Sequence, residues 1–175
     1  WGDYDNDGFL DMSHGDRLYR NQEGNGFEEV SSLIPSSSLG NSRAAAWGDF
    51  NGDSYLDLFI GGYAVGNNYP YEPDALLINN QGQNFTLAWQ ESGTIRAGRG
   101  VTAADFDVDG DLDVYVSNYR LQPNYLFEND GQGNITDTAG SHGAQGGNGH
   151  SIGAAWGDMD NDGHIDLFAG NFAHR

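Results

Sequence analysis

The 175-residue sequence contains no cysteine. Disulfide bridges and thiolate metal sites are therefore excluded. Basic side chains are also scarce: seven Lys and Arg residues stand against 26 Asp and Glu residues, and the formal net charge is −19. A surface this acidic repels the phosphates of nucleic acid, so we expect no nucleic-acid partner. Because the sequence has no run of about 18 apolar residues, which a transmembrane helix requires, we expect no membrane insertion.

Helical periodicity is missing as well. No segment repeats apolar residues at the spacing of an amphipathic helix, which excludes helix bundles and alternating β/α folds. Aromatic residues make up 13% of the chain and lie in regular apolar runs, so the sequence has the material for a core. An acidic, glycine-rich chain without such runs would be expected to remain disordered. We therefore predict an all-β fold.

What the sequence contains in abundance is aspartate at fixed spacing. A nine-residue acidic loop occurs four times, at residues 3–11, 49–57, 105–113 and 158–166. Carboxylates at alternate positions of a tight turn converge, and two charges about 4 Å apart repel by about 4 kcal/mol at an effective dielectric of about 20. A cation between them would relieve this repulsion, and side chains that offer only oxygen favour calcium over zinc or copper. The sequence predicts up to four Ca²⁺ sites.

The acidic loops also mark a long repeat. Their first residues, Asp3, Asp49, Asp105 and Asp158, are 46, 56 and 53 residues apart, which is typical of propeller blades. In each complete unit a small-residue segment precedes the loop, an alternating or apolar run follows it, and a hairpin comes last. We expect the small residues on the innermost strand, where neighbouring blades converge. We interpret the unit as a four-stranded antiparallel blade.

Residues 1–175 are thus predicted to form one partial β-propeller of about three and a half blades. The repeats are expected at about residues 1–43, 44–99, 100–151 and 152–175, the last being incomplete. Propellers contain at least about four blades, and Trp1 falls inside a repeat. Our hypothesis is that further blades belong to a longer natural chain, and assembly from several copies of this chain is the alternative.

The motif itself resembles a known family. The pattern Trp-Gly-Asp-x-Asp-x-Asp-Gly-x-x-Asp-Leu, followed by a Leu-Tyr-x-Asn hairpin, is similar to the FG-GAP or VCBS repeats of integrin-α-like β-propellers. Secreted proteins of the ASPIC/UnbV and cartilage-acidic-protein type look most alike. Four matches in register cover essentially the whole chain. The resemblance implies a propeller of about seven blades, with calcium between the first and second strands and a binding rather than a catalytic role.

The resemblance also implies the ligands. Each ion would be bound by the side chains at positions one, three, five and nine of the loop and by the backbone carbonyl at position seven. These residues are Asp3, Asp5, Asp7, Phe9 and Asp11; Asp49, Asn51, Asp53, Tyr55 and Asp57; Asp105, Asp107, Asp109, Asp111 and Asp113; Asp158, Asp160, Asp162, His164 and Asp166. The second loop departs from the others, because Asn51 removes one charge and Ser54 replaces a glycine where a positive φ is expected. We predict that the second site binds calcium most weakly.

Other calcium motifs fit less well. An EF-hand requires a Glu three positions beyond the last Asp, and the corresponding residues here are His14, Ile60, Val116 and Ala169. Acidic turns that hold no metal are the remaining alternative.

Two further kinds of site are candidates. A long loop at residues 61–74 offers Tyr63, Asn67, Asn68, Tyr69 and Tyr71, which would contact a sugar or a protein partner; a solvated insertion is the alternative. The sequons at Asn84 and Asn134 lie at matching positions of two hairpins and are candidates for N-glycosylation, with turn formation as the alternative.

Two arginines and three tryptophans recur at equivalent positions of the repeat. Arg43 and Arg99 precede the inner strands, with Ile152 in the third unit. The arginines either line the channel mouth and meet an acidic ligand or balance nearby aspartates, and we favour the second interpretation. For Trp1, Trp47 and Trp156 we favour burial between sheets over stacking on a sugar.

No nucleophile and no paired acid and base stand outside the acidic loops, so we name no catalytic residue. We expect a calcium-stabilised β-propeller at the cell surface or outside the cell, where calcium is millimolar. It would serve in binding, adhesion or surface structure, with a protein or glycan partner. The alternative is the propeller domain of a polysaccharide-processing lyase or hydrolase whose active site lies outside the calcium loops.

Overall fold

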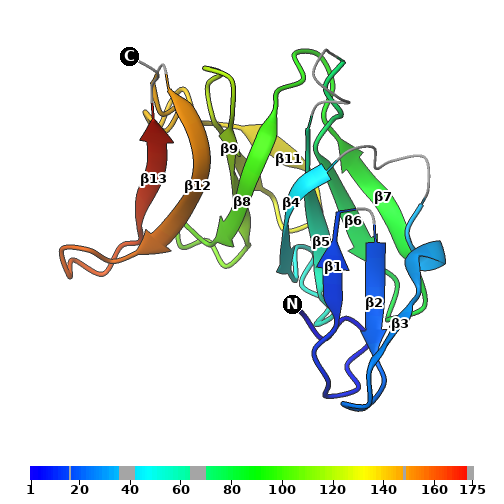
Figure 1. Cartoon of the computed structure of the whole chain (residues 1–175). Coiled ribbons are helices and arrows are strands. Elements are labelled where there is room, and N and C mark those ends of the chain that lie inside the picture. The colour runs from blue at the N-terminus through cyan, green and yellow to red at the C-terminus, as the bar shows by residue number, and fades with distance from the viewer. Residues whose placement is uncertain (16, 36–41, 64–69, 148, 173–175) are drawn as a thin grey trace.

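A computed structural model describes residues 1–15, 17–35, 42–63, 70–147 and 149–172. Within these residues the chain is all-β, as predicted: thirteen strands form four antiparallel sheets, and the helical content is one short 3-10 turn, η1 (Ser31–Leu33). Each sheet is a simple meander, because strands that follow one another in sequence are hydrogen-bonded neighbours. Figure 1 shows the four sheets standing side by side.

The strands divide among the sheets as follows. The first sheet contains β1 (Met12–His14), β2 (Arg17–Asn21) and β3 (Phe27–Glu29). The second contains β4 (Ser42–Gly48), β5 (Asp57–Gly62), β6 (Ala75–Asn79) and β7 (Phe85–Gln90). The third contains β8 (Gly98–Ala104), β9 (Asp113–Asn118), β10 (Tyr125–Asn129) and β11 (Ile135–Asp137). The fourth contains β12 (His150–Gly157) and β13 (Asp166–Phe172).

The first strands of successive sheets lie next to one another. β4 contacts β8, and β8 contacts β12, while the later strands of each sheet spread apart. This approach requires small residues: a Cβ added to Gly61 would lie 2.8 Å from Val101 Cγ2, and one added to Gly100 would lie 2.4 Å from the Ile152 carbonyl oxygen. The expected small residues therefore occupy the strands where neighbouring sheets converge.

Apolar clusters fill the space between neighbouring sheets. Tyr4 and Leu18 of the first repeat pack with Leu58 and Ile60 of the second sheet. Further clusters join the second sheet to the third, through Phe59 and other residues, and the third to the fourth. The strands that face neighbours on both sides, β5 and β9, are buried along their whole length. Burial on both faces explains why these strands are more continuously apolar than alternating.

The three tryptophans at the equivalent position of the repeat differ in burial. Trp47 and Trp156 are partly buried and pack against the apolar clusters, as predicted. Trp1 is 68% exposed, so the prediction of burial is wrong for this residue. The reason is that the first sheet has a neighbouring sheet on one face only.

Candidate metal centre

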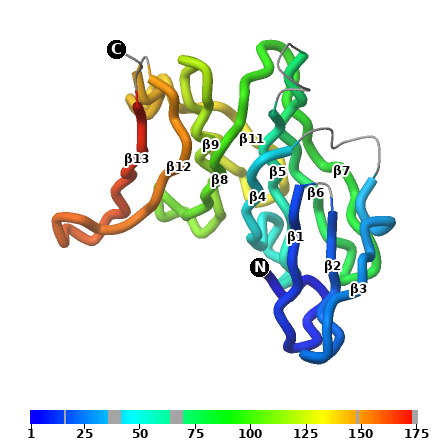
Figure 2. The backbone as a smooth tube through the Cα atoms, in the orientation of Figure 1, coloured from blue at the N-terminus to red at the C-terminus, as the bar shows by residue number. Residues whose placement is uncertain are grey.

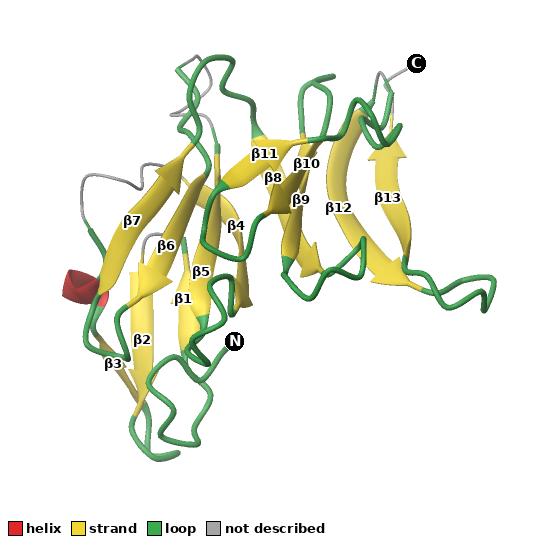
Figure 3. Cartoon of the chain, turned by 180° about the vertical axis from the view of Figure 1, so that it is seen from behind, coloured by secondary structure: helices red, strands yellow, loops and turns green. Residues whose placement is uncertain are grey.

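The four acidic loops lie at one end of the molecule. Three of them connect the first strand of a sheet to the second, between β4 and β5, β8 and β9, and β12 and β13. The remaining loop, residues 3–11, is closed by the isolated bridge between Gly2 and Asp11 and leads into β1. Figures 2 and 3 show the loops at the lower end of the strands from opposite sides. The repeat therefore brings four similar acidic turns to the same end.

The first aspartate folds each turn. The two carboxylate oxygens of Asp3 accept hydrogen bonds from the backbone N–H groups of Asp7 and Gly8. The corresponding bonds recur in all four loops, with N···O distances between 2.8 and 3.1 Å. An aspartate that bonds to nearby backbone N–H groups stabilises a turn without help from distant residues. The loops therefore share one conformation, including the second loop with its two departures.

Two positions of each turn have the left-handed backbone conformation. The fourth-position residues have φ of 58° at Asn6, 73° at Gly52, 65° at Val108 and 63° at Asn161. At the sixth position Ser54 has φ of 71°, which confirms the positive φ expected where the other loops have glycine. Glycine and asparagine adopt this conformation readily, whereas a β-branched side chain such as that of Val108 is strained in it.

The ninth aspartate connects the turn to the sheet. Asp57 is fully buried; its Oδ2 accepts the Phe50 N–H at 2.9 Å and its Oδ1 accepts the Asn79 N–H at 2.8 Å. Asp11 and Asp113 are also fully buried and accept the equivalent pairs of bonds. Burial raises the pKa of Asp57 and of Asp113 to about 6, against the opposing effect of these hydrogen bonds. Each buried carboxylate therefore retains its charge with difficulty unless a cation is close.

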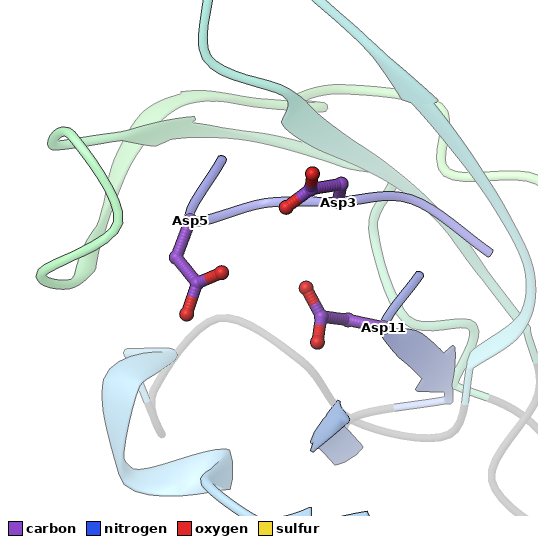
Figure 4. A group of neighbouring side chains, drawn as sticks. All are labelled: Asp3, Asp5 and Asp11. Carbon is purple, nitrogen blue, oxygen red and sulfur yellow. The ribbon is translucent and has the colours of Figure 1, made fainter. Parts of the chain in front are cut away.

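Three loops gather their carboxylates into triads in which one ligand oxygen from each residue lies within 4.8 Å of the others. The triads are Asp3, Asp5 and Asp11; Asp105, Asp107 and Asp113; Asp158, Asp160 and Asp166. In Figure 4 the side chains of the first triad point toward a common centre. The second loop holds Asn51 at the third position, between Asp49 and Asp57. The structure thus brings together the first, third and ninth positions in three of the four predicted ligand sets.

The fifth and seventh positions lie beside the triads. The fifth-position carboxylate accepts the N–H of the seventh-position residue in every loop, at distances between 2.8 and 3.0 Å. The donors are the backbone N–H groups of Phe9, Tyr55, Asp111 and His164, and the acceptors are Asp7, Asp53, Asp109 and Asp162. In each case this bond engages only one of the two carboxylate oxygens.

The donor set fits a hard divalent cation. Every side chain of the triads offers oxygen, which calcium prefers. In the first triad Asp5 Oδ1 is buried and has no hydrogen-bond partner, as expected of an oxygen directed at an ion. Burial and the charge of Asp7 raise the pKa of Asp5. A cation at the centre would satisfy the unpaired oxygen and relieve the repulsion.

An arginine also reaches the first loop, which the sequence reasoning missed. Arg20 Nε lies 3.0 Å from Asp5 Oδ2 and donates to the Tyr4 hydroxyl at 3.0 Å. The equivalent residues of the second and third sheets are Ile78 and Glu128, which carry no positive charge. The first loop is therefore partly neutralised by the chain itself.

A second group of missed residues joins neighbouring loops. The buried Asn79 side chain donates to the Tyr4 carbonyl at 2.7 Å and to the Leu56 carbonyl at 3.0 Å. Asn129 makes the equivalent bonds to the carbonyls of Phe50 and Leu112. Each asparagine thus links the loop of its own sheet to the loop of the preceding sheet. The sequence contained one indication of this role: an asparagine ends the third strand of both units, at Asn79 in β6 and at Asn129 in β10.

Two of the five residues predicted for a ligand loop, Tyr63 and Tyr71, are described by the structure. Asn67, Asn68 and Tyr69 lie outside the described residues. Tyr63 is only 8% exposed and forms a small cluster with the partly buried Tyr71. The hydroxyl-bearing and amide side chains predicted for a ligand loop are therefore described only at its two ends.

The asparagines of both sequons are exposed near the outer strands β7 and β11. Asn84 accepts a hydrogen bond from the Asn80 amide at 2.6 Å, and the Asn134 amide donates to Asp130 at 2.7 Å. Both side chains thus take part in turns and remain at the surface, so glycosylation stays a prediction.

Arg43 and Arg99 were expected to balance nearby aspartates, and no ion pair among the described residues supports this interpretation. In the part of the chain that the structure describes, the ion pairs join Arg17 to Glu29 and Arg20 to Asp5, and neither involves Arg43 or Arg99. The acidic loops lie at the opposite end of the inner strands that carry these arginines.

In the described part of the chain, no helix is long and apolar enough to cross a membrane.

Known proteins share this sequence pattern. The FG-GAP-like repeat matches residues 3–60, 63–116 and 107–169. The chain is 30% identical to cartilage acidic protein 1 of Homo sapiens over 155 residues, which are 83% of this chain and 23% of that protein. It is 31% identical to cartilage acidic protein 1 of Mus musculus over 140 residues, which are 74% of this chain and 21% of that protein. The chain therefore spans about a fifth of the length of these relatives.

Proposed function

This chain belongs to the FG-GAP-like repeat family, and from that premise we propose that it is a calcium-stabilised, extracellular β-propeller segment. It would act as a binding, adhesion or structural surface module for a protein or glycan partner. The observation that carries the proposal is the convergence of three acidic side chains in each of three loops, which fits a hard divalent cation. Cartilage acidic protein 1, to which the chain is similar, supports the extracellular setting by its name.

The proposed role of calcium is structural. The carboxylates at positions one, three, five and nine would hold the ion, with the carbonyl at position seven, and the second loop would use Asn51 in place of an aspartate. When bound, calcium supplies the positive charge that allows these groups to stay ionised side by side. The first aspartate already folds the turn, and the ninth attaches it to the neighbouring strand. Metal binding and folding are therefore coupled.

The proposed architecture is a partial propeller whose blades are the four sheets, with repeats at about residues 1–43, 44–99, 100–151 and 152–175. Adjacent inner strands and diverging outer strands support this arrangement. The relatives are several times longer than this chain, which supports a ring completed by further blades rather than by copies of this chain.

Removal of calcium tests the function. We expect EDTA to lower the melting temperature, because each site occupied at about 100 times its dissociation constant contributes about 2.7 kcal/mol. For a chain of this size that free energy corresponds to about 5 to 10 °C per site. The measurement is thermal unfolding followed by circular dichroism, with excess calcium added back as the control. An identical melting curve in EDTA and in calcium would refute the proposal.

A further inference from the structure

The inner strands carry a repeated irregularity at the end opposite the acidic loops. The pairing register shifts between Ser42 and Ala44, between Gly98 and Gly100, and between Ser151 and Gly153. The extra residues are Arg43, Arg99 and Ile152. A β-bulge redirects a side chain and is common beside binding sites. Because β4, β8 and β12 lie next to one another, the three redirected residues follow one another across this end.

The guanidinium groups of Arg43 and Arg99 both lie near the ring of Tyr63. The guanidinium carbon of Arg43 lies 5.3 Å from the centroid of the Tyr63 ring, and that of Arg99 lies 5.8 Å from the same centroid. Arg99 also lies 4.6 Å from the Tyr119 ring, and its Nη1 donates to the Tyr63 hydroxyl at 3.5 Å. Contacts with aromatic faces orient a guanidinium but do not neutralise its charge. Because each guanidinium carbon lies within 5.8 Å of the same centroid, the two exposed positive charges are less than about 12 Å apart.

The described residues provide no carboxylate partner for this pair. Asp74 lies against Gly98 of β8 and, like Glu91, has Arg96 as a positively charged neighbour. Glu72 bonds to the Tyr63 carbonyl through its backbone N–H, and no ion pair in the described part of the chain joins its carboxylate to Arg43 or Arg99. The loop aspartates begin six residues after Arg43, which is about 20 Å along an extended strand. That distance exceeds the screening length of about 8 Å at physiological salt. The two arginines therefore lie apart from the loops that carry most of the acidic side chains of the chain.

We propose that Arg43 and Arg99 bind an anionic group, a carboxylate or a sulfate, of an acidic saccharide. Guanidinium groups recognise planar carboxylates and other oxyanions through paired N–H donors. Aromatic rings continue the surface beyond the pair: Tyr119 lies 4.3 Å from His150, and His150 lies 5.3 Å from Phe172, between ring centroids. Rings beside a charge pair favour a sugar, whose apolar face packs on them, over an acidic peptide. This inference rests on the proposed binding function and names its ligand class.

Binding to defined probes tests the site. The calcium-loaded chain would be titrated by calorimetry with trigalacturonic acid, a sulfated heparin disaccharide, neutral maltotriose and a tetraglutamate peptide. The variants are Arg43→Gln, Arg99→Gln and the double variant. The matched control is Arg17→Gln, which removes the same charge from an exposed ion pair with Glu29 on the first sheet. We expect one or both acidic saccharides to bind, the double variant to lose at least about tenfold in affinity, and the control to bind as the unchanged chain does.

A gain of binding provides an independent check. Ile152 is 45% exposed and occupies the third bulge, so Ile152→Arg adds a guanidinium beside the first two. We expect this variant to bind the acidic saccharide more tightly, by about threefold or more. Unchanged affinity in Ile152→Arg would count against a shared binding surface.

Other outcomes overturn the proposal directly. These are no binding of either acidic saccharide, equal affinity in the double variant, equal binding of maltotriose, and tighter binding of tetraglutamate. The melting shift caused by calcium is measured on the same samples. If that shift is present while saccharide binding fails, only the anion site is wrong; if the shift is absent, the proposed function is wrong as well.

Discussion

At the scale of single residues, burial sets the chemistry of the acidic loops. Asp57 and Asp113 are fully buried, and their pKa rises to about 6 from an ordinary value of 3.8. Without a cation, the folded chain therefore binds these two protons more tightly than the unfolded chain. The resulting stability is complete below the ordinary pKa and is lost as the pH rises to about 6. A bound cation reverses this trend because it stabilises the ionised form.

Calcium affinity should depend on pH in the corresponding range. Protons compete with calcium for Asp57 and Asp113, so we expect the affinity of the second and third sites to fall below about pH 6, by up to about tenfold per pH unit. The measurement is calorimetric titration with calcium at about pH 5 and about pH 7. Equal affinities at the two pH values would contradict the burial argument, and refolding at neutral pH serves as the control for acid damage.

One residue of the third loop is strained. Val108 has φ of 65° and is 65% exposed, so it has the backbone conformation of its counterparts Asn6 and Asn161 without their adaptability. We expect Val108→Asn to raise the free energy of unfolding by about 1 kcal/mol. Chemical denaturation in calcium measures the change. The control is Leu121→Asn, which replaces another exposed apolar residue at positive φ but lies outside the acidic loops. A Val108→Asn variant less stable than the unchanged chain would show that strain is absent.

At the scale of strands and loops, asparagines connect one unit to the next. Asn79 is 1% exposed and is the donor or acceptor in bonds to its own loop, to the preceding loop and to the turn at Gly82. Asn21 ends the equivalent strand of the first sheet and bonds to Leu10 and Gly24 within its own unit. Asn79 and Asn129 thus link neighbouring loops, whereas Asn21, at the matching position of the first sheet, does not. Asn79 and Asn21 differ in the bond to the neighbouring loop and in burial.

Replacing these asparagines should have unequal effects. We expect Asn79→Ala to lower the free energy of unfolding by about 3 kcal/mol, because the Tyr4 and Leu56 carbonyls lose their donor in a buried setting. Asn21→Ala should lower it by about 1 kcal/mol, because its bonds are exposed to water. Urea denaturation in calcium measures both values. Equal losses in the two variants would show that the link between units contributes nothing.

At the scale of the whole molecule, stability is concentrated between sheets. β5 and β9 are buried throughout and have packed neighbours on both faces, while all three residues of β3 are exposed. The second residue of the first three acidic loops, Tyr4, Phe50 or Phe106, packs into or against these apolar clusters, whereas the loop carboxylates are not part of them. Loss of calcium should therefore loosen one end before the clusters separate.

Hydrogen exchange should reveal this gradient. In calcium we expect the amides of β5 and β9 to exchange most slowly and those of β3 to exchange fastest. In EDTA the loops at residues 49–56 and 105–112 should lose protection before the strands do. Mass spectrometry of peptides from the exchanged protein provides the measurement. Simultaneous loss of protection in loops and strands would mean that calcium removal unfolds the whole chain at once.

Local hydrogen bonding explains what the sequence by itself determined. The all-β class, the acidic loops and the positive φ of Ser54 were all predictable. The bonds that shape each turn join residues two to five positions apart, so the spacing of the aspartates is sufficient to specify it. Alternation and small-residue runs specify the strands in the same local way.

Only the tertiary structure decided which units touch and through which side chains. The bond from Asn79 to Tyr4 spans 75 residues, and that from Asn129 to Phe50 spans 79. Arg99 meets Tyr63 across 36 residues, and Arg20 reaches Asp5 from the hairpin that follows the loop. Such contacts depend on how closely and at what register neighbouring sheets pack. No pattern within one repeat encodes that packing, because it arises from the combined shapes of side chains on two sheets.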